Sequence, residues 1–146
     1  MLDDVSFEVA PGEMVGLVGH NGSGKTTLLR VATRVLAPDA GVVSLAGRPL
    51  QEFSRAELAR SLATLPQDTM LPYPFSALEV VLMGRAPHQP LFGLDRPIDL
   101  ACARAAMELL DIAELADRSI QKLSGGERQL VMFARALAQE PQILLL

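Results

Sequence analysis

Nine consecutive residues, Gly19 to Thr27, combine glycines with a lysine and two threonines in the order GHNGSGKTT. This order fits G-x-x-x-x-G-K-[ST], the pattern of a phosphate-binding loop. Glycines let backbone N–H groups turn inward around an anion, and the helix that follows aims its free N–H groups at the same point. Lys25 is expected to reach the outer phosphates, and Thr26 to offer its hydroxyl to Mg²⁺. The residues predicted to hold the phosphates are Gly19, Asn21, Gly22, Ser23, Gly24, Lys25, Thr26 and Thr27.

The segments on both sides of this loop have the strand–loop–helix order that the pattern requires. Residues 14–18 are a short apolar run, typical of a buried strand, and residues 25–35 have a helical pattern. A chance match in a glycine-rich turn is the alternative interpretation. The agreement of motif and context argues against it.

A second group of small residues, Ser124, Gly125 and Gly126, stands at the predicted start of a later helix. Such residues at a helix N-terminus form an anion nest. Taken alone, they are more typical of a plain N-capped turn. Together with the phosphate loop they indicate two phosphate-binding helix ends. Because one nucleotide has a single γ-phosphate, nests from two different chains could enclose it.

Composition narrows the class of protein. The chain has 146 residues, 49% of them hydrophobic and 21% charged, which predicts a globular domain with a core. The net charge of −4 and the lack of a basic run argue against nucleic-acid binding. A single cysteine, Cys102, indicates a reducing cytoplasm. No apolar stretch reaches the length of a membrane span, so work at a membrane is expected to need a partner chain.

The remaining pattern predicts an α/β chain with a helical insertion. Strands are expected over residues 5–9, 14–18, 42–45, 62–65 and 143–146. Helices are expected over residues 25–35, 55–60, 76–84 and 98–110 and after residue 124, and a loop over 84–96. Ser54 and Ser76 are the expected N-caps, Ser76 in a capping box with Glu79. The predicted division is a core over 1–67, a helical part over 68–122, and a return to the core over 123–146.

Three motifs, in this order, resemble those of ABC-type ATPase domains. Gly19 to Thr26 is similar to the Walker A motif, Gln67 to the Q-loop, and the LSGGERQ run of residues 123–129 to the signature motif. The Arg135 to Ala138 run before Pro141 matches as well, so the resemblance covers essentially the whole chain. It implies a P-loop NTPase fold of the RecA-like kind, with N-terminal antiparallel β-strands and an inserted helical subdomain.

The resemblance implies a site for ATP and Mg²⁺. Gly22 to Lys25 would hold the phosphates, while Thr26 and Gln67 would contact Mg²⁺. Gln67 would also take part in catalysis by sensing the γ-phosphate. Outside this family context, Gln67 is interpreted as an exposed amide at the end of a strand.

The resemblance also implies partners. In this family two ATPase subunits dimerise head to tail, so Ser124, Gly125 and Gly126 of one copy would close on ATP held by the other. A helix N-terminus that faces a phosphate is favourable by ~1 kcal/mol or more when it is shielded from salt. The dimer would sit peripherally on the cytoplasmic face of the inner (plasma) membrane, on integral membrane permease subunits. A periplasmic or surface substrate-binding protein would be an indirect partner.

A narrower resemblance begins at Met83 to His88. With residues 48–50 and 54–59, this run is similar to ATPases that drive uptake of iron–siderophore complexes, haem or cobalamin. His88 is interpreted as a solvated surface residue and not as a metal ligand. The surface around residues 73–85 would dock on the membrane subunit. Three hydrophobic residues there are equally compatible with a core position: Leu71, Tyr73 and Phe75.

Two expected features of the family are missing from the sequence. The aromatic residue that stacks on adenine would precede Val5, and Phe7 is interpreted as a core residue. The aspartate and glutamate that support Mg²⁺ and polarise the attacking water would follow Leu146. We therefore expect a fragment, truncated at both ends, that binds nucleotide weakly, hydrolyses it hardly at all and aggregates through an apolar strand edge.

Two other functions are compatible with the phosphate loop. A soluble ABC-type ATPase of translation or DNA repair would share all three motifs but would have no membrane partner. A kinase or GTPase with a phosphate loop would lack the run of residues 123–129. The modest length of residues 68–122 and the acidic balance favour the transporter subunit.

Overall fold

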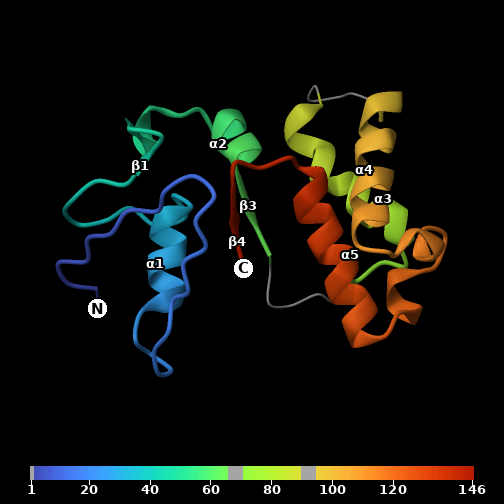
Figure 1. Ribbon diagram of the computed structural model, residues 1–146, viewed down its shortest axis with the longest axis horizontal. Helices are drawn as coiled ribbons and strands as arrows, with labels where there is room; N and C mark the ends of the chain where they lie inside the picture. Colours follow the sequence, from blue (N-terminus) through green and yellow to red (C-terminus); the bar gives the residue numbers. More distant parts are fainter. Residues whose placement is uncertain (1, 66–70, 90–94) are drawn as a thin grey trace. The chain divides into compact units, whose positions relative to one another are not determined.

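The computed structural model describes residues 2–65, 71–89 and 95–146 (Figure 1). The chain divides into two compact units, the first ending at Phe53 and the second beginning at Ser54. Each unit is described by itself. The three-part division expected from the sequence stays a prediction.

The first unit contains one α-helix and one small hairpin. Helix α1 spans Lys25–Ala32 and ends earlier than predicted, because Arg34 adopts a left-handed backbone with φ of 59° that cannot continue an α-helix. Strands β1 (Ser44–Leu45) and β2 (Arg48–Pro49) pair antiparallel, and the 3-10 helix η1 (Leu50–Glu52) follows. The strand predicted over residues 42–45 is therefore confirmed only in its second half.

The strands predicted over residues 5–9 and 14–18 are wrong. Neither segment belongs to any sheet of the described residues. Met14 and Val18 are 95% and 98% exposed, and Phe7, expected in the core, is 56% exposed. A strand is held by backbone hydrogen bonds to a neighbouring strand, and an alternating pattern identifies a buried face without supplying that neighbour.

In its described residues, the second unit is mostly helical, with one parallel pair of strands. Its α-helices are α2 (Arg55–Ser61), α3 (Ala77–Leu82), α4 (Pro97–Leu109) and α5 (Gly125–Ala138). Its 3-10 helices are η2 (Met83–His88), η3 (Ala113–Leu115) and η4 (Ile120–Lys122). Strand β3 (Leu62–Thr64) pairs in parallel with β4 (Ile143–Leu145), with Leu62 opposite Ile143. The loop predicted over residues 84–96 is wrong in its first part, because η2 extends to His88. Pro87 is compatible with a 3-10 turn.

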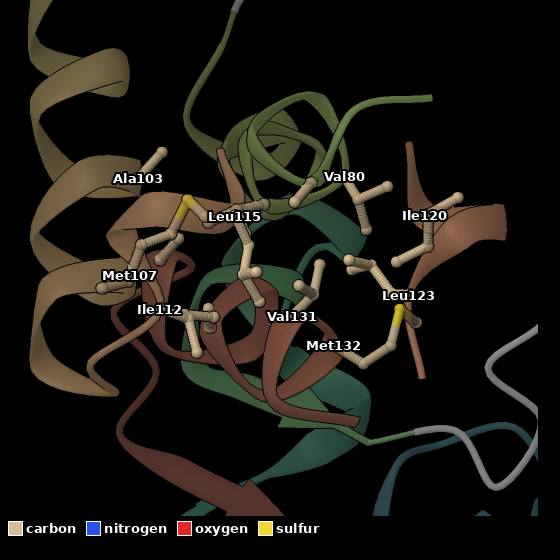
Figure 2. Close-up of a cluster of buried hydrophobic side chains, with 14 residues drawn as sticks. Val80, Ala103, Met107, Ile112, Leu115, Ile120, Leu123, Val131 and Met132 are labelled. Atoms are coloured by element: carbon tan, nitrogen blue, oxygen red, sulfur yellow. The ribbon is translucent and has the colours of Figure 1, made fainter. Parts of the chain in front are cut away.

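Helices α3, α4 and α5 surround the hydrophobic core of this unit (Figure 2). Each helix contributes a fully buried side chain, Val80, Met107 and Val131 respectively. Burying a side chain of this size contributes roughly 1.5–3 kcal/mol. Leu71 and Phe75 pack against the core, whereas Tyr73 is 65% exposed. Of the three residues that were equally compatible with a core position and a docking surface, two therefore belong to the core and one lies at the surface.

Three helices begin with the same arrangement of capping hydrogen bonds. Ser54, Ser76 and Ser124 each accept a hydrogen bond from the backbone N–H three residues later, at 3.2, 3.2 and 3.3 Å. In each case the glutamate at that later position accepts a bond of 2.7 Å from the backbone N–H of the serine. These capping boxes confirm the predicted starts of α2, α3 and α5. In the part of the chain that the structure describes, no helix combines the length and the apolar character needed to cross a lipid bilayer.

Candidate phosphate-binding site

Two glycines shape the loop before α1. Gly22 and Gly24 have φ values of 85° and 94°, in the left-handed region that side chains rarely adopt. The N–H of Ser23 donates to the carbonyl oxygen of His20 at 3.2 Å, which closes the turn between them. The glycine pattern in the sequence therefore matches two places where the backbone requires glycine.

The side chain of Lys25 folds back over this loop. Its ammonium nitrogen Nζ lies 2.6 Å from the carbonyl oxygen of Gly19, 2.9 Å from that of His20 and 3.3 Å from Oγ of Ser23. The positive charge is therefore surrounded by the loop that precedes it. An anion entering the loop would meet this ammonium and the N–H groups of the turn together.

The N-terminus of α1 is open. Gly24 is its N-cap, no described side chain caps it, and its first turn has no acidic residue. Thr26 and Thr27 are exposed in that turn. Free N–H groups at a helix start carry partial positive charge and bind phosphate. Because Mg²⁺ binds oxygen and keeps several waters and phosphate oxygens as ligands, the hydroxyl of Thr26 fits one of its positions. Gln67, the other predicted Mg²⁺ contact, lies outside the described residues.

The second nest is exposed at the start of α5. Ser124 uses its hydroxyl in the capping box, which agrees with the plain interpretation of this turn. Ser124, Gly125 and Gly126 are all exposed, and a Cβ on either glycine would meet nothing within 4 Å. Hydrogen bonds from Ser124, and the nearby guanidinium of Arg118 at 3.1 Å, hold the pKa of Glu127 below its usual value. The nest is therefore accessible, and phosphate binding there stays a prediction.

The second unit contains a buried ionic cluster that no sequence pattern predicts. Arg85, predicted in a loop, is only 3% exposed, and its Nε lies 3.3 Å from Oδ1 of Asp99. His88, predicted to be a solvated surface residue, is only partly exposed, and its ring nitrogen Nε2 lies 2.8 Å from the carbonyl oxygen of Gln139, so that interpretation is correct only in part. These partners are 14 and 51 residues apart in sequence, so no local pattern signals them.

Comparison with known proteins agrees with these features. The family model described as ABC transporter matches residues 2–146. The hemin import ATP-binding protein HmuV of Nocardia farcinica is 48% identical over 146 residues, which are 100% of this chain and 50% of that protein. The cobalamin import ATP-binding protein BtuD of Halobacterium salinarum is 45% identical over 146 residues, 100% of this chain and 36% of that protein.

A solved structure supports the same relationship. The ATP binding subunit of an ABC transporter superposes with a TM-score of 0.79 at 25% identity, covering 98% of this chain and 57% of that one. The chain thus spans half or less of the length of the two curated relatives. The match over residues 2–146, joined with this likeness of fold, shows a mixed α/β P-loop NTPase fold. The chain belongs to the ABC transporter family.

Proposed function

We propose that this chain is part of the ATP-binding subunit of an ABC importer for haem, cobalamin or an iron–siderophore complex. The observation that carries the proposal is the loop from Gly19 to Lys25, whose lysine ammonium lies among the loop's own oxygens at the open start of α1. The 48% and 45% identities to hemin and cobalamin import proteins support the class of cargo.

The residues of the loop account for nucleotide binding. The Lys25 ammonium exchanges its bonds to the Gly19 and His20 carbonyl oxygens for bonds to phosphate oxygens. Backbone N–H groups of the loop and of the first turn of α1 orient the phosphate chain. The Thr26 hydroxyl would be one ligand of Mg²⁺, and Gln67 is proposed as a second contact. Bound MgATP supplies the phosphoryl group whose transfer to water drives transport.

A second copy of the subunit completes the site in this proposal. The exposed nest of Ser124, Gly125 and Gly126 in one copy closes on the ATP held by the other, and hydrolysis separates them. Among the described residues, none outside this helix start has an atom within 4 Å of a Cβ at either glycine, which leaves room for a close approach. The pair sits peripherally on the cytoplasmic face of the membrane, on integral permease subunits.

We propose that these 146 residues do not include the aspartate and glutamate with which the family supports Mg²⁺ and polarises the attacking water. A protein made of these residues alone would then bind ATP and turn it over very slowly. Its purification and assay tests this point. Rapid turnover by the 146 residues that Lys25→Ala abolishes would contradict it.

Nucleotide binding is tested in the full-length gene product by calorimetric titration with MgATP. Lys25→Ala removes a charge-assisted contact worth roughly 1.5–3 kcal/mol, so affinity should fall about tenfold to a hundredfold. Arg30→Ala, which removes an exposed charge from the last turn of the same helix, should change affinity less than twofold. Equal affinities for Lys25→Ala and the parent would refute nucleotide binding by this loop.

The transport role is tested by what the full-length protein binds in its own cells. Co-purification with a polytopic membrane protein, lost when that protein's gene is deleted, is the expected result. Association with ribosomes or DNA in place of a membrane protein would favour the soluble ABC-type ATPase of translation or DNA repair.

A further inference from the structure

Helix η2 lies against the C-terminal end of α5. The backbone of Gly84 in η2 lies so close to α5 that a Cβ there would be 2.1 Å from the carbonyl oxygen of Arg135. Arg85 donates from Nη1 to the carbonyl oxygen of Ala138 at 2.6 Å. The ring of His88 contacts the carbonyl oxygen of Gln139. Carbonyl groups at the end of a helix have no partner within the helix, and here two of them find one in η2.

A buried ion pair joins this contact to the start of α4. Asp99 is fully buried, and it accepts from Nε of Arg85 at 3.3 Å and from Nε of Arg96 at 2.9 Å. The hydrogen bonds from Arg96 hold the pKa of Asp99 well below its usual range, so it remains a carboxylate. Arg85 also donates to Glu140 at 2.7 Å. Buried charges are tolerated only when paired in this way. We call Gly84, Arg85, His88 and Asp99 the α5 clamp.

The clamp restricts the position of α5 along and about its own axis, which the core packing of α5 does not. Val131 and Met132 pack α5 against α3 and α4 through apolar contacts, which are non-directional. Hydrogen bonds have restricted lengths and angles, so the clamp specifies where α5 stands along and about its own axis. Fixing register is the best-attested use of buried polar groups. A helix of 14 residues extends about 20 Å, and the nest at Ser124 lies at its other end.

We propose that Arg85 is a positioning residue that sets the axial register of α5 and thereby the place of the Ser124–Gly126 nest. The functional half of this inference rests on the proposed closure of that nest on ATP held by a second copy. Without Arg85, Asp99 keeps Arg96 as a partner, while the end of α5 loses the bond to the Ala138 carbonyl oxygen and keeps only the His88 contact of the clamp. Helix α5 then samples more than one position.

The register is measured without nucleotide, by the distance between spin labels. Glu108→Cys on α4 and Gln129→Cys on α5 place labels at exposed positions of the full-length protein, with Cys102→Ser and any other cysteines replaced. The parent and Arg104→Gln, which changes an exposed arginine of α4, should give the same narrow distance distribution. Arg85→Gln should give a broader or displaced one. An Arg85→Gln distribution equal to that of the parent would overturn the proposal.

Loss of stability is separated from loss of position by a second variant. Val80→Ala removes buried volume from α3 without touching the clamp, and it lowers stability. Its distance distribution should match that of the parent. If Val80→Ala broadens the distribution as much as Arg85→Gln does, Arg85 has only a general structural role.

The functional consequence is measured as ATP-dependent dimerisation of the full-length parent, Arg85→Gln and Val80→Ala proteins. Arg85→Gln should raise the dimer dissociation constant at least tenfold and change MgATP binding by the monomer less than twofold, while Val80→Ala dimerises as the parent does. Equal dimerisation by Arg85→Gln and the parent would overturn the link between Arg85 and the nest. If the parent itself does not dimerise with ATP, the proposed function fails, and the label distances still decide the role of Arg85.

Discussion

The ammonium group of Lys25 donates a hydrogen bond of 2.6 Å to the carbonyl oxygen of Gly19, at the opposite end of the same loop. Gly19 also lies against Ser23, since a Cβ on Gly19 would be 2.6 Å from Oγ of Ser23. At Gly19 the loop is closed by the hydrogen bond from the Lys25 ammonium. At the same residue, the absence of a side chain lets the backbone lie against Ser23. Both features have consequences for nucleotide binding.

Gly19→Ala is expected to weaken MgATP binding at least tenfold. The added methyl group displaces the Ser23 side chain, which also accepts a bond from Lys25, and so disturbs the loop. Gly16→Ala is the matched control, because a Cβ there would meet nothing within 4 Å and its affinity should stay within twofold of the parent. Calorimetric titration measures both. Equal losses in the two variants would contradict the role given to the close approach of Gly19 to Ser23.

Gly84→Ala is expected to destabilise the protein by about 3 kcal/mol or more. The added Cβ would overlap a backbone oxygen of α5, which can move only if the helix moves. Gly126→Ala, in the first turn of the same helix, meets open space and should change stability by about 1 kcal/mol at most, in the stabilising direction. Urea unfolding compares them. Similar midpoints for both variants would contradict the close contact between η2 and α5.

Helix starts are the part of the fold that the sequence predicts best. Ser54, Ser76 and Ser124 each stand three residues before a glutamate, and that local spacing is the whole capping box. The phosphate loop is predicted for a similar reason, because left-handed φ at Gly22 and Gly24 is a local property of glycine.

Features that depend on distant partners are not predicted. Arg85 is buried because Asp99 and Glu140, 14 and 55 residues away, neutralise its charge. Residues 5–9 alternate as a strand does, but no described segment pairs with them. Periodicity identifies which side of a segment is apolar, whereas pairing and burial of charge are decided by tertiary contacts.

Stability should fall as the solution becomes more acidic than about pH 4.5. A backbone hydrogen bond from Ser76 lowers the pKa of Glu79 in the folded protein, and bonds from Ser124 lower that of Glu127. In the window between the usual and the lowered values the unfolded chain binds more protons, so stability rises with pH there. The stabilisation that these two glutamates contribute is fully present above the window and is lost as pH falls through the folded pKa values.

Glu79→Gln tests this pH dependence. The glutamine keeps an oxygen that accepts from Ser76 but takes up no proton, so the fall in unfolding free energy between about pH 5 and pH 3 should be smaller than in the parent. Glu114→Gln, at an exposed position of η3, is the control and should keep the parent's profile. Chemical unfolding at a series of pH values gives the result. A Glu79→Gln profile as steep as the parent's would be inconsistent with the role given to this cap.

In the proposed dimer, Ser124 of one copy closes on ATP held by the loop of another. Ser124→Ala and Ser76→Ala break capping boxes of the same geometry, and each should cost about 1 kcal/mol of stability. Sedimentation of the full-length protein with ATP measures the effect on dimerisation directly. Ser124→Ala should raise the dimer dissociation constant at least tenfold, while Ser76→Ala should leave it unchanged. Equal dimerisation by the two variants would contradict the proposed closure.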